Sequence, residues 1–181
     1  IAPLAKISSR NDLSIFDPFN SFNWLMNLSE KHDLKSVFFF ISGFTDKNFD
    51  ANYSIDDKRI KKLLSRIFNR GHEIGLHPSY NSFLSKEKIA QEAESLQHSC
   101  SAEGILFPLE SSRMHYLRWQ QPETAKNCDE AGLKYDFTLG FPELIGFRCG
   151  TCFRYNMFDA KNQLELKIKQ VPLLVMDDTL L

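Results

Sequence analysis

The sequence predicts an α/β fold in which buried strands alternate with amphipathic helices. Residues 36–43 form a short apolar run that is typical of a strand covered on both faces, and residues 72–77 predict a further strand. Residues 57–70, which lie between them, carry apolar side chains at helical spacing. Because parallel strands need a long crossover connection, usually a helix, this order predicts a parallel sheet with helices outside it. We expect about six or seven strands, arranged as a barrel or as an open doubly wound sheet.

The first third of the chain supplies one further strand and two helix starts. Residues 13–16 (LSIF) predict a short buried strand. Asp17 and Pro18 then predict the start of a helix, because Asp caps helices and Pro fits their first turn. The helix over residues 57–70 is predicted by apolar residues at i, i+3, i+4, i+7 and i+8, and Gly71 is placed to end it. Its apolar stripe consists of Ile60, Leu63, Leu64, Ile67 and Phe68.

The rest of the chain repeats the alternation. Ser85 is placed to cap a helix that carries Ile89, Ala93, Leu96 and Cys100 on one face. Pro122 begins a further helix, which ends at Gly132. The remaining strands are predicted at residues 113–119, 135–141, 146–150 and 163–176.

Composition limits the classes of function that need to be considered. The 181 residues are 43% hydrophobic and carry a net charge of −1, which suits one domain with a sizeable core. No basic block is present, so a nucleic-acid partner is not expected. The longest apolar run is far shorter than the roughly 20 residues that span a bilayer, and the first residues lack a signal-peptide core. We therefore expect a cytoplasmic protein without a membrane span.

Four cysteines are too few for a disulfide scaffold. Cys149 and Cys152 form a C-x-x-C motif, but no second pair completes a structural zinc site. A thioredoxin-like motif would stand between a strand and a helix, and only a short segment follows this one. We interpret both residues as ordinary buried thiols, with a redox or metal role as the alternative.

Polar residues follow several predicted strands. Asp17, His77 and Arg118 stand at or just after strand ends, and Asp136 and Arg148 lie in two later strands. Because reactive groups gather at the carboxyl ends of parallel strands, we expect these side chains to converge on one site at that edge of the sheet. Each also has a structural interpretation, such as a helix cap for Asp17 or a hydrogen-bonded strand end for His77. We interpret His32, His72, His98 and His115 as structural.

Several segments resemble the polysaccharide deacetylase (NodB-homology) superfamily. "RGHEIGLHPSYNSF" is similar to the family's second motif, and "YLRWQQPETAKNCDEAGLKYDFTLGF" to its third motif and the helix and strand that follow. "GLHPSY", "HYLRW" and "GFRCGTC" resemble the subgroup that is encoded with bacterial surface-polysaccharide genes. The resemblance spans roughly residues 15–180. It implies a single domain over residues 1–181, built as a distorted (β/α) barrel of about seven parallel strands.

The resemblance also implies metal-dependent removal of acetyl groups from a polysaccharide or oligosaccharide. The ion would be zinc or cobalt, held by an Asp and two His residues. By motif position, His77 matches the first metal histidine, Asp17 an acid that serves as ligand or base, and Asn81 the place of the second histidine. Arg118 matches the arginine that holds the base, and Asp136 matches the acid of the fourth motif. The resemblance therefore assigns Asp17, Arg118 and Asp136 to catalysis, and His77, Asp17 and Asn81 to the metal.

The sequence departs from the family pattern at three places. Pro18 follows Asp17 where a second acid is usual, and Asn81 replaces a histidine with a neutral and weaker zinc ligand. The late Leu-x-x-His strand is not visible before Leu181, so we expect the barrel to lack its last strand or strands.

These departures leave three hypotheses. The protein is a hydrolase that deacetylates a bacterial surface glycan, or a metal-free relative that only binds glycan. In both, substrate would contact Tyr80, Tyr116, Trp119 and Arg148. The third hypothesis is a fragment of an unclosed barrel, whose exposed last strand would favour a homodimer.

Overall fold

The computed structural model describes residues 20–180, and the chain divides into two compact units, Ile1–Ser36 and Val37–Leu181. In the first unit the described residues form helix α2, Phe22–Lys31. The Ser29 hydroxyl donates to the Leu25 carbonyl of this helix at 3.0 Å and lies 2.7 Å from the Ser36 hydroxyl. The strand predicted at residues 13–16 and the helix start predicted at Asp17 lie outside the described residues.

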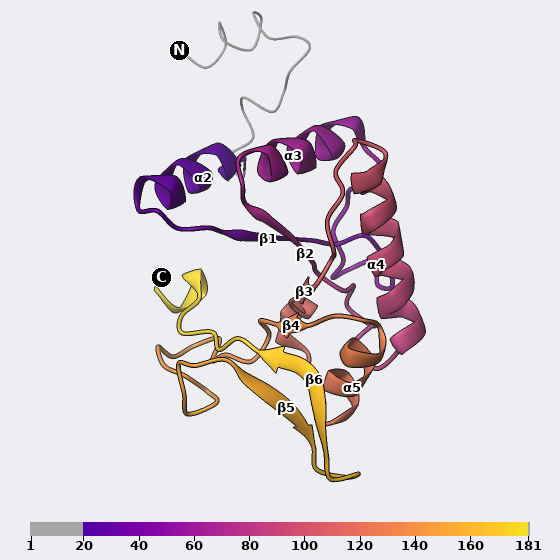
Figure 1. The fold of residues 1–181 in the computed structure, drawn as a ribbon, viewed down its shortest axis with the longest axis vertical. Coiled ribbons are helices and arrows are strands. Elements are labelled where there is room, and N and C mark those ends of the chain that lie inside the picture. Colours follow the sequence, from indigo (N-terminus) through magenta and orange to yellow (C-terminus); the bar gives the residue numbers. More distant parts are fainter. Residues whose placement is uncertain (1–19, 181) are drawn as a thin grey trace, which may run out of the picture. The chain divides into compact units, whose positions relative to one another are not determined.

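The second unit contains a six-stranded sheet with the order β1-β2-β3-β4-β6-β5. All neighbouring strands are parallel except β5 and β6, which form an antiparallel hairpin, drawn in orange and yellow in Figure 1. The strands are β1 Val37–Phe40, β2 Glu73–Leu76, β3 Ser111–Ser112, β4 Tyr135–Asp136, β5 Tyr155–Asp159 and β6 Leu164–Gln170. The predicted α/β class is confirmed. The described residues form an open strand order ending at β1 and β5, so a barrel of seven parallel strands is not what they show.

Helices α3 (Lys58–Asn69), α4 (Lys86–Ser101) and α5 (Glu123–Glu130) connect the parallel strands (Figure 1). α3 and α4 pack on β2, and α5 packs on β5, β6 and α4. Asp57 caps α3 by accepting from the Arg59 amide, and Ser85 caps α4 by accepting from the Lys88 amide, as its sequence predicts. The core includes Leu64, Ile67, Ile74, Leu76, Ile89, Leu96, Cys100, Ala125, Cys128 and Ile168.

The strand predicted at residues 113–119 is displaced from β3, the strand predicted at residues 146–150 is wrong, and β5 is missed. Residues 113–119 leave the sheet after β3, because Tyr116 and Leu117 adopt positive φ angles of 57° and 50° that no strand allows. Residues 146–150 form turns, with positive φ at both glycines. The missed strand, β5, pairs with β6 through a turn in which the Asp159 carboxylate accepts from the Asn162 amide at 3.1 Å.

The four cysteines are free. Cys100 and Cys128 are the buried thiols, whereas Cys149 is half-buried and Cys152 is exposed, so the predicted burial of the C-x-x-C pair is wrong. Within residues 20–180, every helix is too short or too polar to cross a membrane.

Candidate active site

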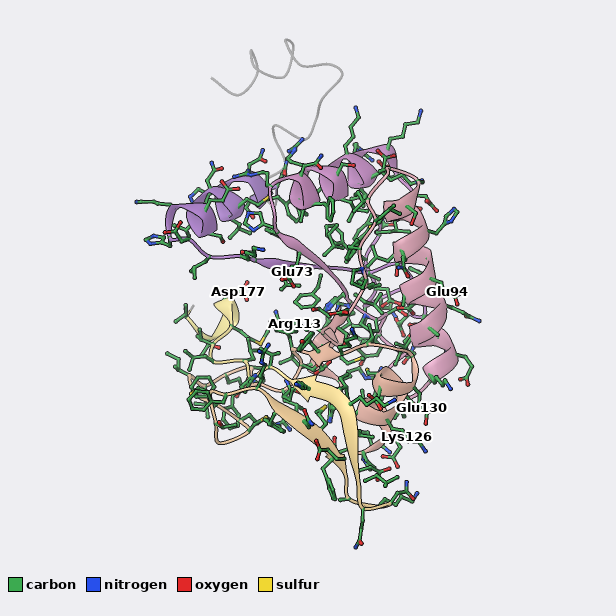
Figure 2. All side chains as sticks on the ribbon, in the orientation of Figure 1. Glu73, Glu94, Arg113, Lys126, Glu130 and Asp177 are labelled. Atoms are coloured by element: carbon green, nitrogen blue, oxygen red, sulfur yellow. The ribbon has the colours of Figure 1, made fainter. Side chains whose placement is uncertain are left out.

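The carboxyl ends of β1, β2 and β3 bring together most of the residues that the sequence singled out. The His77 amide donates to the Phe40 carbonyl at 2.8 Å, and the Arg113 amide donates to the Leu76 carbonyl at 3.0 Å. These bonds continue the parallel ladder by one residue. His77 therefore directly follows β2, and Arg113 (Figure 2) directly follows β3, at the same edge of the sheet.

His77 faces a second histidine that the sequence analysis interpreted as structural. The His115 Nδ1 atom lies 3.0 Å from the His77 Nε2 atom. The two rings meet edge-on, with centroids 4.9 Å apart and an interplanar angle of 74°. His115 Nε2 lies 2.7 Å from the Phe49 carbonyl oxygen. His115 thus belongs to this edge. Positive φ angles at Tyr116 and Leu117, the two residues that follow His115, turn the chain off the strand predicted at residues 113–119.

His77 is held in its neutral form. Burial, together with the nearby charge of His115, lowers the pKa of His77 to about 4. The residue as a whole is half-buried, but its Nδ1 atom is buried without a hydrogen-bond partner. The backbone of Arg113 and the charge of Asp50 both raise this pKa, so the Arg113 backbone lies beside the ring, outside ordinary hydrogen-bond geometry.

Three aromatic rings, Phe49, Tyr80 and Tyr116, form an aromatic cluster next to the two histidines. Phe49 stacks on Tyr80 with centroids 4.4 Å apart, and Tyr116 meets both rings edge-on. His115 also contacts Tyr80 and Tyr116 edge-on. The Tyr116 side chain is 63% exposed and that of Phe49 is 41% exposed, so the cluster presents apolar ring surface to solvent.

Arg118 lies on the other side of Tyr80. Its guanidinium is between two rings, 4.0 Å from the Tyr80 centroid and 4.1 Å from the Phe83 centroid. Arg118 Nη1 donates to the Tyr80 carbonyl at 2.7 Å and to Asn81 Oδ1 at 2.9 Å. The Asn81 amide nitrogen donates in turn to the Thr45 carbonyl at 3.3 Å. Asn81 therefore fixes the guanidinium and links it to the loop after β1.

Two carboxylates hold the loop of residues 77–85 in place. Asp50 accepts from the backbone amides of Thr45, Asp46 and Tyr80 at 2.6–2.7 Å. Burial by itself raises the pKa of Asp50, but these hydrogen bonds outweigh it and keep the pKa below its ordinary value. Sequence reasoning missed this residue, because a loop Asp without a motif carries no signal of its partners.

Glu92 supports the same loop from α4. This buried carboxylate accepts from the Ser79 amide at 2.7 Å, the Ser79 hydroxyl at 2.5 Å and the Ser82 hydroxyl at 2.6 Å. A side chain at Gly43 would collide with the Glu92 carboxylate, so the glycine permits this close approach. The loop is thus anchored on both sides by satisfied acceptors.

Asp136 is fully buried at the end of β4. It accepts from the Thr138 amide at 2.8 Å, the Thr138 hydroxyl at 2.9 Å and the Ser112 hydroxyl at 3.2 Å. Burial raises the pKa of Asp136 to about 6, against these hydrogen bonds and the charge of Arg113. Arg113, rather than Arg118, is the arginine that acts on this carboxyl group.

The other predicted site residues lie apart or outside the described residues. Asp17 is not among residues 20–180. The Trp119 indole donates to the Gln121 side chain at 3.0 Å. Arg148 is exposed in the loop between β4 and β5.

Two imidazole nitrogens are the groups at this edge that suit a metal ion. Among residues 20–180, no three His, Cys, Asp or Glu side chains form a complete ligand group. His77 Nε2 and His115 Nδ1 nevertheless face each other 3.0 Å apart, and imidazole nitrogen is a ligand that Zn²⁺ and Co²⁺ accept. The residues present therefore fit part of a metal site.

Comparison with known proteins adds one match. A family model described as polysaccharide deacetylase matches residues 17–134. This range includes His77, His115 and Arg118 and all three rings of the aromatic cluster. No curated protein and no solved structure matches the chain.

Proposed function

The chain belongs to the polysaccharide deacetylase family, and we propose that it is a hydrolase that removes acetyl groups from a bacterial surface glycan. The observation that carries the proposal is the position of His77. It directly follows β2 at the sheet edge where reactive groups gather, and it contacts His115, whose ring packs against Tyr80 and Tyr116 of the exposed aromatic cluster.

The aromatic cluster supports a carbohydrate substrate. The C–H face of a sugar ring packs on aromatic faces, and Tyr116 and Phe49 offer exposed ring surface. Because the His115 ring touches Tyr116, a sugar on the cluster would lie next to the two histidines. Trp119 and Arg148 would contact more distant units of the polymer.

Arg118 would orient the reacting carboxylate. Its planar guanidinium lies over the Tyr80 and Phe83 rings and donates from Nη1, and it has further N–H donors on Nη2 and Nε. The resemblance assigns Asp17 as the partner, acting as base or ligand. Asn81 would serve this arrangement by accepting from Arg118, since an amide oxygen next to a guanidinium is a poor place for a cation.

His77, with Asp17, would hold a divalent ion such as zinc or cobalt. When bound, such an ion polarises the acetyl carbonyl and lowers the pKa of water. His77 suits the role because its burial keeps the imidazole neutral at pH 7. Asp136 is fully buried and would act as a positioning residue, through Thr138 and the neighbouring Arg113.

Acetate release from an acetylated oligosaccharide tests the proposal. We expect His77→Ala to lower kcat/KM at least 100-fold, while the exposed His98→Ala on α4 leaves it unchanged. His77→Gln should lose activity as fully, with a free energy of unfolding within about 1 kcal/mol of wild type. Unchanged turnover in either His77 variant would contradict the proposal. Oligosaccharide binding without turnover in the wild type would favour the glycan-binding alternative.

A further inference from the structure

His115 presents a lone pair to His77. A carbonyl oxygen only accepts hydrogen bonds, so the 2.7 Å contact with the Phe49 carbonyl places a proton on His115 Nε2. In neutral His115 the other ring nitrogen, Nδ1, then carries the lone pair, and this atom is the one that faces His77 Nε2. A backbone carbonyl that fixes the far nitrogen of an imidazole is the usual support of a metal-binding histidine.

The separation of the two nitrogens agrees with ligands on one ion. Zn–N bonds of about 2.0–2.1 Å at a tetrahedral angle place two ligand nitrogens about 3.3 Å apart. The observed 3.0 Å differs by a few tenths of an ångström. An N–H···N hydrogen bond has a similar length, so the tautomer of His77 decides between the two arrangements.

The surroundings of His77 Nδ1 favour the arrangement with an ion. If His77 donated from Nε2 to His115, its buried Nδ1 would hold a lone pair that no donor meets. With the proton on Nδ1, the adjacent polar group is the Arg113 backbone, whose effect on His77 is that of an acceptor. Nε2 then carries a lone pair that faces the lone pair of neutral His115 at 3.0 Å, an arrangement that a shared cation, either a metal ion or a proton, stabilises.

We propose that His115 replaces the histidine missing at position 81, so that His77 Nε2 and His115 Nδ1 are the two imidazole ligands of a divalent cation. The inference rests on the proposed function only for the location of the site, since cation binding needs no substrate. Asn81 is already engaged by Arg118 and by the Thr45 carbonyl.

The backbone around His115 is built to hold this orientation. Tyr116 and Leu117 both adopt the left-handed conformation, which costs non-glycine residues roughly 1 kcal/mol or more each. The Met114 amide donates to the Thr138 hydroxyl at 2.9 Å and fixes the chain just before His115. Strain of this kind persists where the surrounding contacts determine it, and it often marks functional positions.

Zinc titration of the chelator-treated full chain, followed by calorimetry, tests the inference. We expect one Zn²⁺ per chain, with affinity reduced at least tenfold in both His77→Ala and His115→Ala. The matched controls are Asn81→Ala, which removes the alternative ligand, and His98→Ala, which removes an exposed histidine. Both should stay within threefold of wild type. Unchanged affinity in His115→Ala, or a tenfold loss in Asn81→Ala, would overturn the inference.

A second measurement does not depend on folded variants. Long-range ¹H–¹⁵N spectra of wild-type protein report each imidazole nitrogen separately. We expect the Nδ1 signal of His115 and the Nε2 signal of His77 to shift on zinc addition, while His115 stays protonated on Nε2. Unshifted signals at one equivalent of zinc would refute the pair.

The two proposals fail separately. Zinc bound by both histidines in a protein that releases no acetate would sink the proposed function alone. Acetate release by the wild type, together with an unchanged zinc affinity in His115→Ala, would overturn the inference alone.

Discussion

The loop after β2 and the loop after β4 leave the same edge of one sheet but are built differently. Residues 77–85 are tied down by Asp50 on one side and Glu92 on the other, and they hold Arg118 through Asn81. Residues 137–154 instead expose large apolar side chains, at Leu144, Ile145 and Phe153. Position at a strand end is therefore not enough to fix the geometry of a loop. A loop can present functional groups in a fixed geometry only when buried acceptors satisfy its backbone and side chains.

Removing Glu92 should have the largest effect on this comparison. Glu92→Ala leaves the Ser79 amide and two serine hydroxyls without their buried acceptor, which should lower the free energy of unfolding by about 4 kcal/mol. Urea denaturation measures the change. Glu94→Ala is the matched control, because Glu94 is exposed on the same helix (Figure 2) and should change stability by less than about 0.5 kcal/mol. Equal effects of the two variants would show that the loop does not depend on its anchor.

Asp136 should make stability depend on pH with an unusual sign. Its pKa rises from 3.8 to about 6 on folding, so between these values the folded state binds more protons than the unfolded state. The contribution of Asp136 to stability is therefore full below pH 4 and is lost as pH rises through 6. The difference of about two units corresponds to about 3 kcal/mol. Denaturation of wild type and Asp136→Asn at pH 4 to 7 should show their stability difference changing by up to this amount. A constant difference would mean that Asp136 ionises normally.

Arg118→Lys tests the contacts of the guanidinium with Tyr80, Phe83 and Asn81, and it should have a smaller effect than the two preceding changes. An ammonium group cannot stack flat between Tyr80 and Phe83 while it holds Asn81, so we expect kcat/KM for acetate release to fall about 10- to 100-fold. Arg59→Lys, at an exposed arginine on α3, serves as the control. Unchanged turnover in Arg118→Lys would remove the guanidinium from the site.

The loop after β4 should give the smallest effect. Phe153 is 76% exposed, so Phe153→Ser should change the free energy of unfolding by less than about 0.5 kcal/mol and leave KM within twofold. Phe49→Ser removes an exposed ring of the aromatic cluster, so it should raise KM severalfold. Kinetics on one acetylated oligosaccharide compare the two. A larger KM change for Phe153→Ser would move substrate contact to the loop after β4.

Local patterns predicted the elements whose stability is local. The apolar stripe around Leu64 and Ile67, the cap at Ser85 and the runs that became β1 and β2 lie where periodicity and capping place them. Residues 113–119 misled because their apolar alternation resembles a strand. The conformation of the chain there depends instead on tertiary contacts, including the Thr138 hydroxyl, which accepts a hydrogen bond from the Met114 amide.

Patterns in the sequence therefore predict the α/β class, the order of β1, α3 and β2, and the position of His77 directly after β2. These features depend on side-chain spacing within a few residues. Three features follow from tertiary contacts alone: His115 faces His77, Arg118 donates to Asn81, and the buried Glu92 carboxylate anchors the loop after β2. The contact between His115 and the Phe49 carbonyl joins residues 66 positions apart, and it exists because two positive φ angles turn the chain toward a distant loop. Spacing within one segment carries no information about such a contact.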